Sequence, residues 1–350
     1  MNLKKINTIE NTATVKMALE KLGHTGSKHA LTIFVINKNV VVGSLTDGDV
    51  RRGLLKGSSL DDSVEQIMFR GFRYLRQNNY SIEYLEELKK LEIDLIPLLN
   101  EKNELVRIID FSKKKTLLPI DAIIMAGGEG KRLRPLTLNV PKPLVTLNNK
   151  AIIDYNIDRL ESYGVNRFYI SVNYLKDKIK AHLGDGKERE ITIEYLDETE
   201  PLGTIGAASK ILDFNHNAVL VMNSDLLTNI DYEDFYKTFL ASNADMAVAS
   251  ASYQFNVPYG IFELDGDKIL TLKEKPTYTY HSNAGIYLIK KELLNLIPKN
   301  SFFNATDLMN ELIKLNKIVI NFPIRGYWLD IGQHEDYIKA QEDIKHINFS

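Results

Sequence analysis

The sequence predicts an α/β fold: a mostly parallel, mixed sheet with helices on its faces, preceded by a smaller α+β region. Two observations support this expectation. Beyond residue 120, short apolar runs alternate with amphipathic segments, which is the order that a parallel sheet with crossover helices requires. Before residue 112, two units of similar pattern follow one another. A chain of 350 residues is also long enough for about two domains.

Composition indicates an ordinary soluble protein, with 44% hydrophobic residues, 26% charged residues and a formal net charge of −2. This near balance of charge gives no reason to expect nucleic acid as a partner. The absence of cysteine excludes disulfides, thiolate nucleophiles and cysteine zinc sites, and it suits a reducing cytosol. No apolar run has the length of a signal-peptide core or of a membrane span, so we expect a cytoplasmic protein without membrane contact.

The first part of the chain predicts two copies of one helix–strand–strand unit. Its expected elements are, in order, a helix over 15–22, strands at 30–36 and 40–44, a helix over 82–91, and strands at 95–99 and 105–109. A polar run with three consecutive lysines then separates this part from the rest. We therefore expect repeat units at 1–57 and 58–115, a linker at 116–120 and a second domain at 121–350.

Five apolar runs beyond the linker predict the strands of the main sheet, at 122–125, 168–172, 191–195, 218–222 and 247–251. Two amphipathic segments between them, 152–160 and 207–212, predict helices. In an open α/β sheet, ligands bind at the carboxyl ends of the strands. Residues that directly follow these runs are therefore the candidates for a functional site.

A glycine-rich loop follows the first of these strands. Gly127, Gly128 and Gly130 allow backbone N–H groups to approach an anion without interference from Cβ atoms. Positive charge surrounds this loop, at Lys131, Arg132, Arg134 and Lys142. A P-loop is excluded because Arg132 stands where Ser or Thr is needed, and the third glycine of a dinucleotide fingerprint is missing. The loop is expected to bind the phosphates of a nucleotide.

From Gly127 to Pro143, the sequence resembles the signature G-G-x-G-x-R-L-x-P-L-T-x-x-x-P-K-P of the sugar-1-phosphate nucleotidyltransferases, a family that includes mannose-1-phosphate guanylyltransferases. The resemblance implies a Rossmann-like nucleotide-diphospho-sugar transferase fold. We expect Arg132 to grip the β- and γ-phosphates and Lys142 to lie at the α-phosphate. The loop residues expected to contact the nucleotide are Ala126, Gly127, Gly128, Gly130 and Lys131.

Two aspartates are candidates for a metal site. Asp225 ends the apolar run 218–222 within Asn-Ser-Asp, and a carboxylate in this position can hold a hard cation. Asp330 lies in Trp-Leu-Asp-Ile-Gly, which contains the only tryptophan of the chain. Both runs resemble the transferase family, in which the equivalent aspartates coordinate Mg²⁺. The expected cofactor is therefore Mg²⁺ on Asp225 and Asp330.

A loop that lies between the glycine-rich loop and Asp225 in the sequence is expected to hold the nucleobase. In the resembled family this loop contacts the base through backbone groups, which implies roles for Pro201, Leu202, Gly203 and Thr204. The spelling Pro-Leu-Gly-Thr is similar to enzymes that use purine triphosphates, GTP in particular. Thr204 is also a good N-cap for a helix beginning near Gly206, and both roles are compatible.

The sugar phosphate is expected to meet residues from a later pair of motifs. Lys275 in Glu-Lys-Pro supplies an ammonium for the phosphate, and Glu274 can accept hydrogen bonds from vicinal hydroxyls. The family resemblance carries this site over to Tyr259, Gly260, Glu274, Lys275 and Asn283.

The N-terminal tandem resembles a cystathionine-β-synthase (CBS) domain pair, because Gly43 to Val50 matches the ligand-binding signature of that family. The resemblance implies that Thr46 meets phosphate and Asp49 meets ribose hydroxyls of an adenosine nucleotide. The second unit lacks this signature. Ligand sensing and mere packing into a homo-oligomer remain equally open for the tandem.

Together these motifs predict an enzyme that transfers GMP from GTP to a sugar 1-phosphate, a hexose or amino-hexose such as glucosamine 1-phosphate, by direct magnesium-assisted in-line displacement. The fusion resembles bacterial nucleotidyltransferases of surface-sugar pathways that lead to legionaminic acid or heptose. One alternative is a uridylyl or thymidylyl transferase acting on glucose 1-phosphate. Another is a catalytically silent nucleotide sensor, against which the intact charged residues argue.

Overall fold

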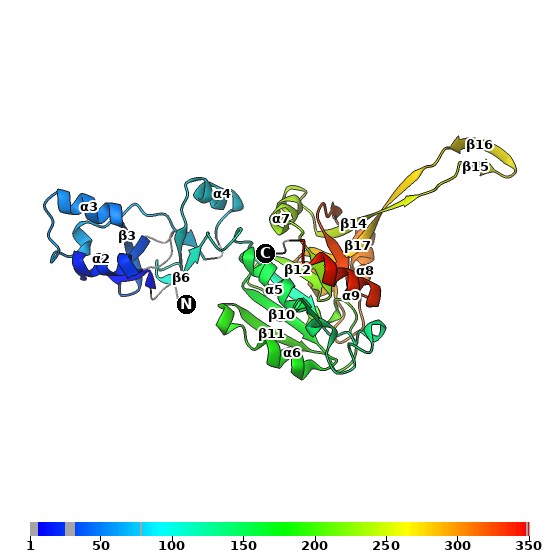
Figure 1. Cartoon of the computed structure of the whole chain (residues 1–350), viewed down its shortest axis with the longest axis horizontal. Coiled ribbons are helices and arrows are strands. Elements are labelled where there is room, and N and C mark those ends of the chain that lie inside the picture. Colours follow the sequence, from blue (N-terminus) through cyan, green and yellow to red (C-terminus); the bar gives the residue numbers. More distant parts are fainter. Residues whose placement is uncertain (1–5, 25–31, 78, 348, 350) are drawn as a thin grey trace. The chain divides into compact units, whose positions relative to one another are not determined.

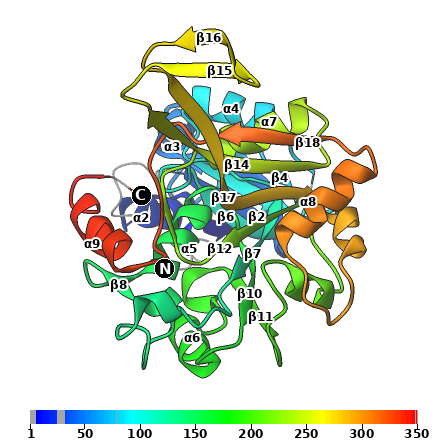
Figure 2. The ribbon, with the colours of Figure 1, turned by 90° about the vertical axis from the view of Figure 1, so that its right-hand side faces the viewer.

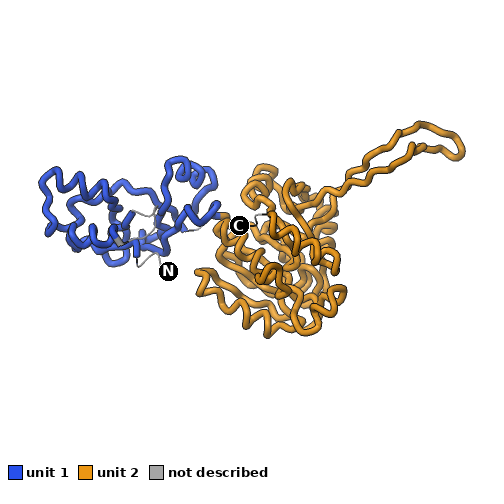
Figure 3. The backbone as a smooth tube through the Cα atoms, in the orientation of Figure 1, with its two compact units in different colours: residues 1–117 blue, residues 118–350 orange. Residues whose placement is uncertain are grey.

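The computed structural model describes residues 6–24, 32–77, 79–347 and 349, and it separates into two compact units, residues 1–117 and 118–350 (Figure 3). The boundary between these units, after Leu117, falls within the segment 116–120 expected as a linker. Among the helices of these described residues, none is long and apolar enough to cross a membrane.

The first unit contains two small sheets of one topology. In each sheet a parallel pair of strands is followed by an antiparallel hairpin, so that β1, β2 and β3 are arranged like β4, β5 and β6. The repeated sequence pattern thus corresponds to a repeated backbone arrangement. Its elements are β1 (Thr8–Glu10), α2 (Val15–His24), β2 (Thr32–Asn37), β3 (Val40–Thr46), α3 (Asp47–Leu55), β4 (Leu75–Arg76), α4 (Ile82–Lys90), β5 (Leu95–Leu99) and β6 (Leu105–Asp110). The first two residues of the strand expected at 30–36 lie outside the described residues.

A seven-stranded sheet forms the centre of the second unit, in the order β11-β10-β7-β12-β17-β14-β18 (Figure 2). Neighbouring strands pair in parallel except around β17, which runs antiparallel to both β12 and β14. The prediction of a mostly parallel, mixed α/β sheet is confirmed. Its strands are β7 (Ile120–Met125), β10 (Arg167–Val172), β11 (Thr192–Asp197), β12 (Ala218–Asn223), β14 (Met246–Asn256), β17 (Thr277–Lys290) and β18 (Val319–Pro323).

The strands are central because their side chains are apolar on both faces. All residues of β12 but the last are buried, and β7 is buried from Ile120 to Ile124. Met125 pairs with Asn223, so the carboxyl ends of β7 and β12 meet at one edge. The remaining elements are β8 (Thr146–Leu147), β9 (Lys150–Ala151), α5 (Ile152–Ser162), α6 (Lys176–Leu183), β13 (Leu226–Thr228), α7 (Tyr232–Ala241), α8 (Ala305–Lys314), β19 (Trp328–Asp330) and α9 (His334–Asp343).

One helix prediction is wrong. The segment expected as a helix over 207–212 forms only a five-residue 3-10 helix, Gly206–Lys210, and the side chain of Leu212 is 99% exposed. The backbone N–H of Gly206 donates to the carbonyl oxygen of Phe303 at 3.1 Å, which fixes this segment against the chain that precedes α8. Four apolar residues were too few to distinguish this packed turn from an amphipathic helix.

Beyond the sheet, β14 and β17 continue as a two-stranded ribbon, which β15 (Ile261–Asp265) and β16 (Lys268–Lys273) prolong to its tip. We call residues 252–282 the arm. Figure 1 shows it in yellow, projecting from the rest of the second unit. Every residue of the arm is exposed or half-buried.

Candidate active site

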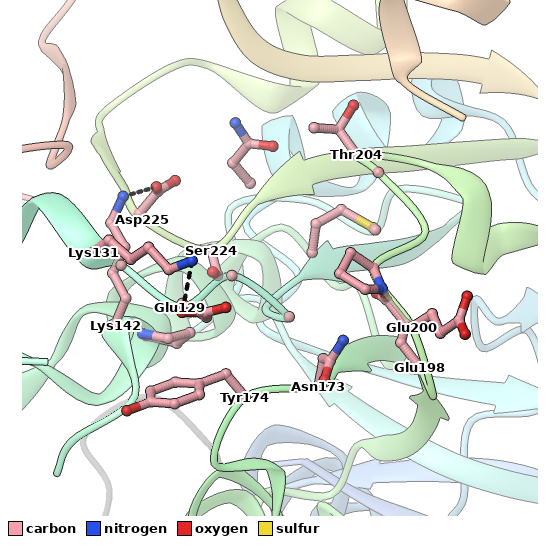
Figure 4. Close-up of a pocket in the computed structure, with 18 of the residues that line it drawn as sticks. Glu129, Lys131, Lys142, Asn173, Tyr174, Glu198, Glu200, Thr204, Ser224 and Asp225 are labelled. Atoms are coloured by element: carbon pink, nitrogen blue, oxygen red, sulfur yellow. Dashed lines mark hydrogen bonds and ion pairs between the residues drawn. The ribbon is translucent and has the colours of Figure 1, made fainter. Parts of the chain in front are cut away.

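A cavity of about 700 Å³ opens at the carboxyl ends of β7 and β12 (Figure 4). The glycine-rich loop lines it together with Lys142, most of the loop 198–204, and the three residues 223–225 that follow the buried part of β12. Of the residues predicted to contact the nucleotide, Ala126 and Leu202 are buried behind the surface and do not line the cavity. The others do. Three regions that are distant in sequence thus meet where ligand binding is expected.

The reason why glycine suits its position differs among the three glycines of the loop. Gly130 has a φ of +61°, and a Cβ there would lie 3.0 Å from the Cβ of Lys142. A Cβ on Gly127 would lie 3.1 Å from Oε1 of Glu198. Gly128 has no atom within 4 Å of such a position, so its backbone faces open space. The hydroxyl of Thr137 donates to the carbonyl oxygen of Gly130 at 2.8 Å and fixes the loop from behind.

Lys142 projects into the cavity from a short 3-10 helix, Lys142–Leu144, which begins after Pro141. Its ammonium donates to Oδ2 of Asp225 and forms an ion pair with it. The two side chains are 13% and 18% exposed, so both charges are largely removed from water. In Figure 4 this pair lies on the opposite side of the view from Glu198 and Thr204.

Asp330 reaches the same place through the pairing of two short strands. β13 and β19 are antiparallel, with Leu226 opposite Asp330, and the N–H of Ile331 donates to the carbonyl oxygen of Asp225 at 3.0 Å. Burial raises the pKa of Asp330, and the neighbouring carboxylate of Asp225 raises it further, whereas Lys142 acts in the opposite direction. The two predicted metal ligands are therefore neighbours.

The donor set at this position fits a divalent cation. Oδ1 of Asp225 and Oδ1 of Asp330 are both buried and have no hydrogen-bond partner among the described residues. Buried polar atoms are normally satisfied, and two unsatisfied carboxylate oxygens in one place suit a hard cation with oxygen ligands. Within the described ranges, no group of three or more His, Cys, Asp or Glu side chains could hold a metal ion. Further ligands would come from other oxygen donors, such as bound phosphate or water.

Arg132 connects the glycine loop with the segment that carries Asp330. A Cβ on Gly332 would lie 3.4 Å from Nη2 of Arg132, so this glycine leaves room for the guanidinium. Gly332 lines the cavity as well. Arg132 is exposed, and its charge also opposes the rise in the pKa of Asp330. A cation free to meet solvent at the cavity mouth is well placed for a polyphosphate.

The loop predicted to hold the nucleobase is fixed to the start of α8. Gly203 has a φ of +78°, and a Cβ there would lie 2.6 Å from the carbonyl oxygen of Phe303. The hydroxyl of Thr204 accepts a hydrogen bond from the N–H of Ala305 at 2.9 Å, and Asn304 accepts one from the N–H of Thr204 at 3.2 Å. Thr204 therefore stabilises the first turn of α8, and the expectation that it caps a helix near Gly206 is wrong.

Glu198 was not predicted as a site residue. It lines the cavity although it is only 6% exposed, and its carboxylate accepts hydrogen bonds from the hydroxyl of Ser171 and, at 2.9 Å, from the N–H of Leu202. It therefore links the base loop to strand β10. One sequence feature could have indicated this role: Glu198 is a carboxylate that directly follows the strand β11 and precedes a loop with Pro201 and Gly203.

Comparison with known proteins decides the family. A model described as nucleotidyl transferase matches residues 121–347. The chain belongs to the nucleotidyl transferase family. Similar proteins include the mannose-1-phosphate guanyltransferase of Debaryomyces hansenii, 32% identical over 230 residues, and the D-glycero-alpha-D-manno-heptose 1-phosphate guanylyltransferase of Aneurinibacillus thermoaerophilus, 30% identical over 232 residues. These matches cover 62% and 65% of this chain. The chain spans 62% of the length of the first relative and 99% of the second.

A solved structure gives the same result. The crystal structure of HddC from Yersinia pseudotuberculosis complexed with GMP-PN is 28% identical, with a TM-score of 0.50. The similarity covers 64% of this chain and 99% of that structure. The nucleotidyl transferase family thus accounts for the second unit, whereas the family match does not include residues before 121.

Four of the five residues predicted for the sugar site lie on the arm of this nucleotidyl transferase and not at its cavity. Tyr259 and Gly260 lie between β14 and β15, and Glu274 and Lys275 lie between β16 and β17. The two connections face each other, because a Cβ on Gly260 would lie 3.0 Å from Oε2 of Glu274. All four residues are exposed, and none of them lines the cavity.

Asn283 is the exception, because it lies at the base of the arm. Its side chain donates to the hydroxyl of Tyr287 at 2.9 Å and accepts from the N–H of Gly285 at 2.9 Å. A Cβ on Gly285 would lie 2.7 Å from Nδ2 of Asn223, which lines the cavity. Asn283 is therefore next to residues that contact the cavity wall.

Thr46 and Asp49 lie together at the start of α3 in the N-terminal unit. Oδ2 of Asp49 accepts hydrogen bonds from the N–H of Thr46 at 2.8 Å and from its hydroxyl at 2.6 Å, which closes a capping box. Arg52 forms an ion pair with the other oxygen of Asp49 at 2.6 Å. Their proximity has a structural explanation in this cap, and the role in binding an adenosine nucleotide stays a prediction.

Proposed function

We propose that this nucleotidyl transferase transfers GMP from GTP to a sugar 1-phosphate and releases pyrophosphate. The observation that carries the proposal is the cavity in which the open backbone of the glycine loop faces the paired charges of Lys142 and Asp225. The preference for guanine is supported by the relatives, two of which are named as guanylyltransferases, and by the GMP-PN complex of HddC.

The proposed reaction needs no general base or covalent enzyme intermediate, because a phosphate oxygen of the sugar is already an anion at pH 7. This oxygen forms a bond to the α-phosphorus, while the bond from that phosphorus to the oxygen shared with the β-phosphorus breaks. The electron pair of the broken bond leaves with pyrophosphate. The obstacle is repulsion between two polyanions, so positioning and charge neutralisation supply most of the acceleration.

Two cations of the cavity would carry out this neutralisation. Arg132 would bind the β- and γ-phosphates, which become the leaving group, and Lys142 would bind the α-phosphate. An ammonium has three donors, so Lys142 can keep its bond to Asp225 while it donates to a phosphate oxygen. We also propose Lys275 as the cation for the incoming sugar phosphate.

Asp225 and Asp330 would hold Mg²⁺ through the two carboxylate oxygens that have no partner in the described residues. When bound, the ion would supply positive charge that lowers the repulsion between the two phosphate groups. A protein that uses these metabolites would act in the cytoplasm, as the sequence predicts.

For the acceptor we propose a hexose or amino-hexose 1-phosphate. The names of the relatives include mannose 1-phosphate and a heptose 1-phosphate, so both belong in the test. Pyrophosphate release should be measured for GTP, ATP, UTP, CTP and dTTP, each combined with mannose, glucose, glucosamine and heptose 1-phosphates. We expect GTP to exceed every other nucleotide in kcat/KM by roughly tenfold or more.

The same assay tests the two alternative functions. Preference for UTP or dTTP with glucose 1-phosphate would establish the uridylyl or thymidylyl transferase instead. No pyrophosphate from any pair, despite GTP binding by calorimetry, would establish the silent nucleotide sensor. The Asp225→Asn variant provides the background rate.

For the N-terminal unit we propose a CBS-like pair that either binds one adenosine nucleotide at Thr46 and Asp49 or only joins two chains. Calorimetry with AMP and ATP on the full chain separates these roles. Asp49→Asn keeps one acceptor for the cap, and it should abolish binding if the carboxylate holds ribose hydroxyls. Unchanged affinity in this variant would assign the nucleotide to another place.

A further inference from the structure

The arm has two chemically different faces. In its outer half, cross-strand pairing puts four apolar side chains on one face: Phe262, Leu264, Ile269 and Leu272. The opposite face carries the ion pair between Glu263 and Lys273. In the inner half, four aromatic side chains share a face in the same way: Tyr253, Phe255, Tyr278 and Tyr280. The other face of the inner half is polar, with Thr277 donating to Asn256 at 2.7 Å.

The apolar face is exposed in this chain. The exposed fractions are 52% for Phe255, 61% for Tyr253 and Tyr280, and 54% to 58% for the four apolar residues of the outer half. A two-stranded ribbon alone is only marginally stable in water. Exposed apolar side chains gathered on one face of each half of such a ribbon mark an interaction surface.

The arm leaves the sheet at the edge where the cavity opens. β14 runs in the same direction as β12, because both are antiparallel to β17. The ribbon then continues through seven consecutive residue pairs, from Ser250 opposite Asn283 to Asn256 opposite Thr277. These pairs carry the chain about 20 Å beyond the sheet. The unbroken ladder therefore holds Lys275 away from the cavity of its own chain.

Most of the basic side chains that line the cavity are already paired with carboxylates. Two of the cavity's cations already have carboxylate partners in the same wall: Lys142 is paired with Asp225, and Lys131 with Glu129 at 3.2 Å. A second phosphate needs a further cation. Lys275 stands in a turn with a φ of +43°, exposed between Glu274 and Pro276, on an arm that leaves by the cavity edge.

We propose that two copies of this chain exchange arms, and that Lys275 of one copy completes the sugar-phosphate side of the other copy's cavity. The proposal rests on the proposed function for the role of Lys275. A two-fold axis would make the exchange reciprocal, since the same surface would be used twice. On the receiving side, Phe302 lines the cavity and is 64% exposed, which offers an aromatic contact to the apolar face of the arriving arm.

Complementation between two impaired chains tests the exchange. Lys275→Ala and Asp225→Asn chains should be co-expressed with different tags, and the mixed dimer isolated by two affinity steps. In a dimer with exchanged arms, one site receives an intact cavity from the first chain and an intact arm from the second. We expect the mixed dimer to have about half of the wild-type activity, while each variant alone is inactive.

A second mixed dimer, in which one chain carries both substitutions, provides the matched control. Wild type is paired with a chain that carries Lys275→Ala and Asp225→Asn together, so that the same two substitutions are present in a different distribution. With exchanged arms both sites of this dimer are defective, and it should be inactive. If each arm serves its own chain, this dimer has about half of the wild-type activity and the first mixed dimer has none, which would overturn the proposal.

Chemical cross-linking tests the same geometry without catalysis. The native chain contains no cysteine, so introduced cysteines react alone. Tyr259→Cys on the arm and Glu200→Cys at the cavity, in separately tagged chains, should be joined by a short bismaleimide into a product with both tags. A link only within one chain that carries both substitutions would overturn the exchange. Gln254→Cys, on the polar face of the arm, should give no such product.

This design separates the two proposals. If wild type releases no pyrophosphate but the cross-link between chains forms, the arm exchange stands and the enzymatic function fails. If wild type is active and Lys275→Ala is as active as wild type, the role of Lys275 in the partner's cavity is refuted while GMP transfer stands.

Discussion

Ile331 donates its backbone N–H to the carbonyl oxygen of Asp225 at 3.0 Å, and this single bond continues the ladder in which β13 faces β19. The separation of the two carboxylates is thus set by backbone pairing and not by contacts of the side chains themselves. Lys142 then compensates one of the two negative charges through Oδ2 of Asp225. The outcome is a pair of acids whose remaining oxygens are available for a cation.

Replacing Asp225 by Asn should reduce kcat by roughly 10²–10³ or more, because a central electrostatic stabiliser is lost. The substitution keeps the size of the side chain and one acceptor for Lys142. Steady-state kinetics at saturating magnesium measures the effect, and circular dichroism verifies the fold. Asp213→Asn, an exposed position outside the cavity, should retain full activity. Normal turnover of Asp225→Asn would refute the metal assignment.

Replacing Asp330 by Asn should stabilise the protein in a chelator at neutral pH while it abolishes activity. The pKa of Asp330 is raised in the folded state, chiefly by burial and then by Asp225. The favourable contribution of Asp330 to the free energy of unfolding is therefore present at acid pH, and it is lost as the pH rises through the raised pKa. Asn carries no charge and avoids this loss.

Calorimetry in EDTA between pH 4 and pH 8 measures the effect of Asp330→Asn on stability. The melting temperature of Asp330→Asn should exceed that of wild type at pH 8, and the difference should shrink as the pH approaches the ordinary aspartate range near 4. A wild type that is the more stable protein at pH 8 in EDTA would contradict the raised pKa.

Replacing Glu198 by Ala should weaken nucleotide binding more than sugar-phosphate binding. The variant leaves the hydroxyl of Ser171 and the N–H of Leu202 without their acceptor in a buried place. Each loss costs about 1–3 kcal/mol of unfolding free energy. Urea denaturation and separate KM values for the two substrates test the prediction. Glu200→Ala, its exposed neighbour, should change stability by less than about 0.5 kcal/mol.

Two glycine substitutions should affect different properties, one the free energy of unfolding and the other the nucleotide affinity. Gly203→Ala places a Cβ 2.6 Å from the carbonyl oxygen of Phe303 at a φ of +78°, and it should lower the free energy of unfolding by about 1–3 kcal/mol. Gly128→Ala meets no atom within 4 Å and should leave stability unchanged. It should instead reduce nucleotide affinity in calorimetry, because its methyl group occupies the space proposed for phosphate. Equal melting temperatures for both variants would refute this distinction.

The sequence predicted the central sheet because its strands are short apolar runs of a length that a helix rarely has. The ends of β12 and β7 also indicated the functional edge, since Asp225 and the glycine loop directly follow them. The helix over 207–212 could not be judged in the same way. Its pattern depends on packing against Phe303, a neighbour that is distant in sequence.

The arm was not predictable from local pattern. Alternation such as Phe262, Glu263 and Leu264 is typical of any strand with one buried face, and it does not say which surface buries that face. The role of Lys275 at the sugar phosphate stays a prediction, and the distance of its turn from the cavity depends on the ladder between β14 and β17. Glu198 was missed because its place directly after β11 does not reveal the hydrogen bonds with Ser171 and Leu202 that hold it in the cavity wall.

The short pairing of β13 with β19 also has a consequence for biosynthesis. Asp225 follows β12, whereas Asp330 lies beyond α8 and β18, so the two carboxylates come from segments that are far apart in the sequence. A ribosome-bound chain that has not yet reached Trp328 can begin to fold its earlier elements, but it cannot bring these two carboxylates together. Nascent chains that end before Trp328 would therefore contain the glycine loop without the proposed cation site.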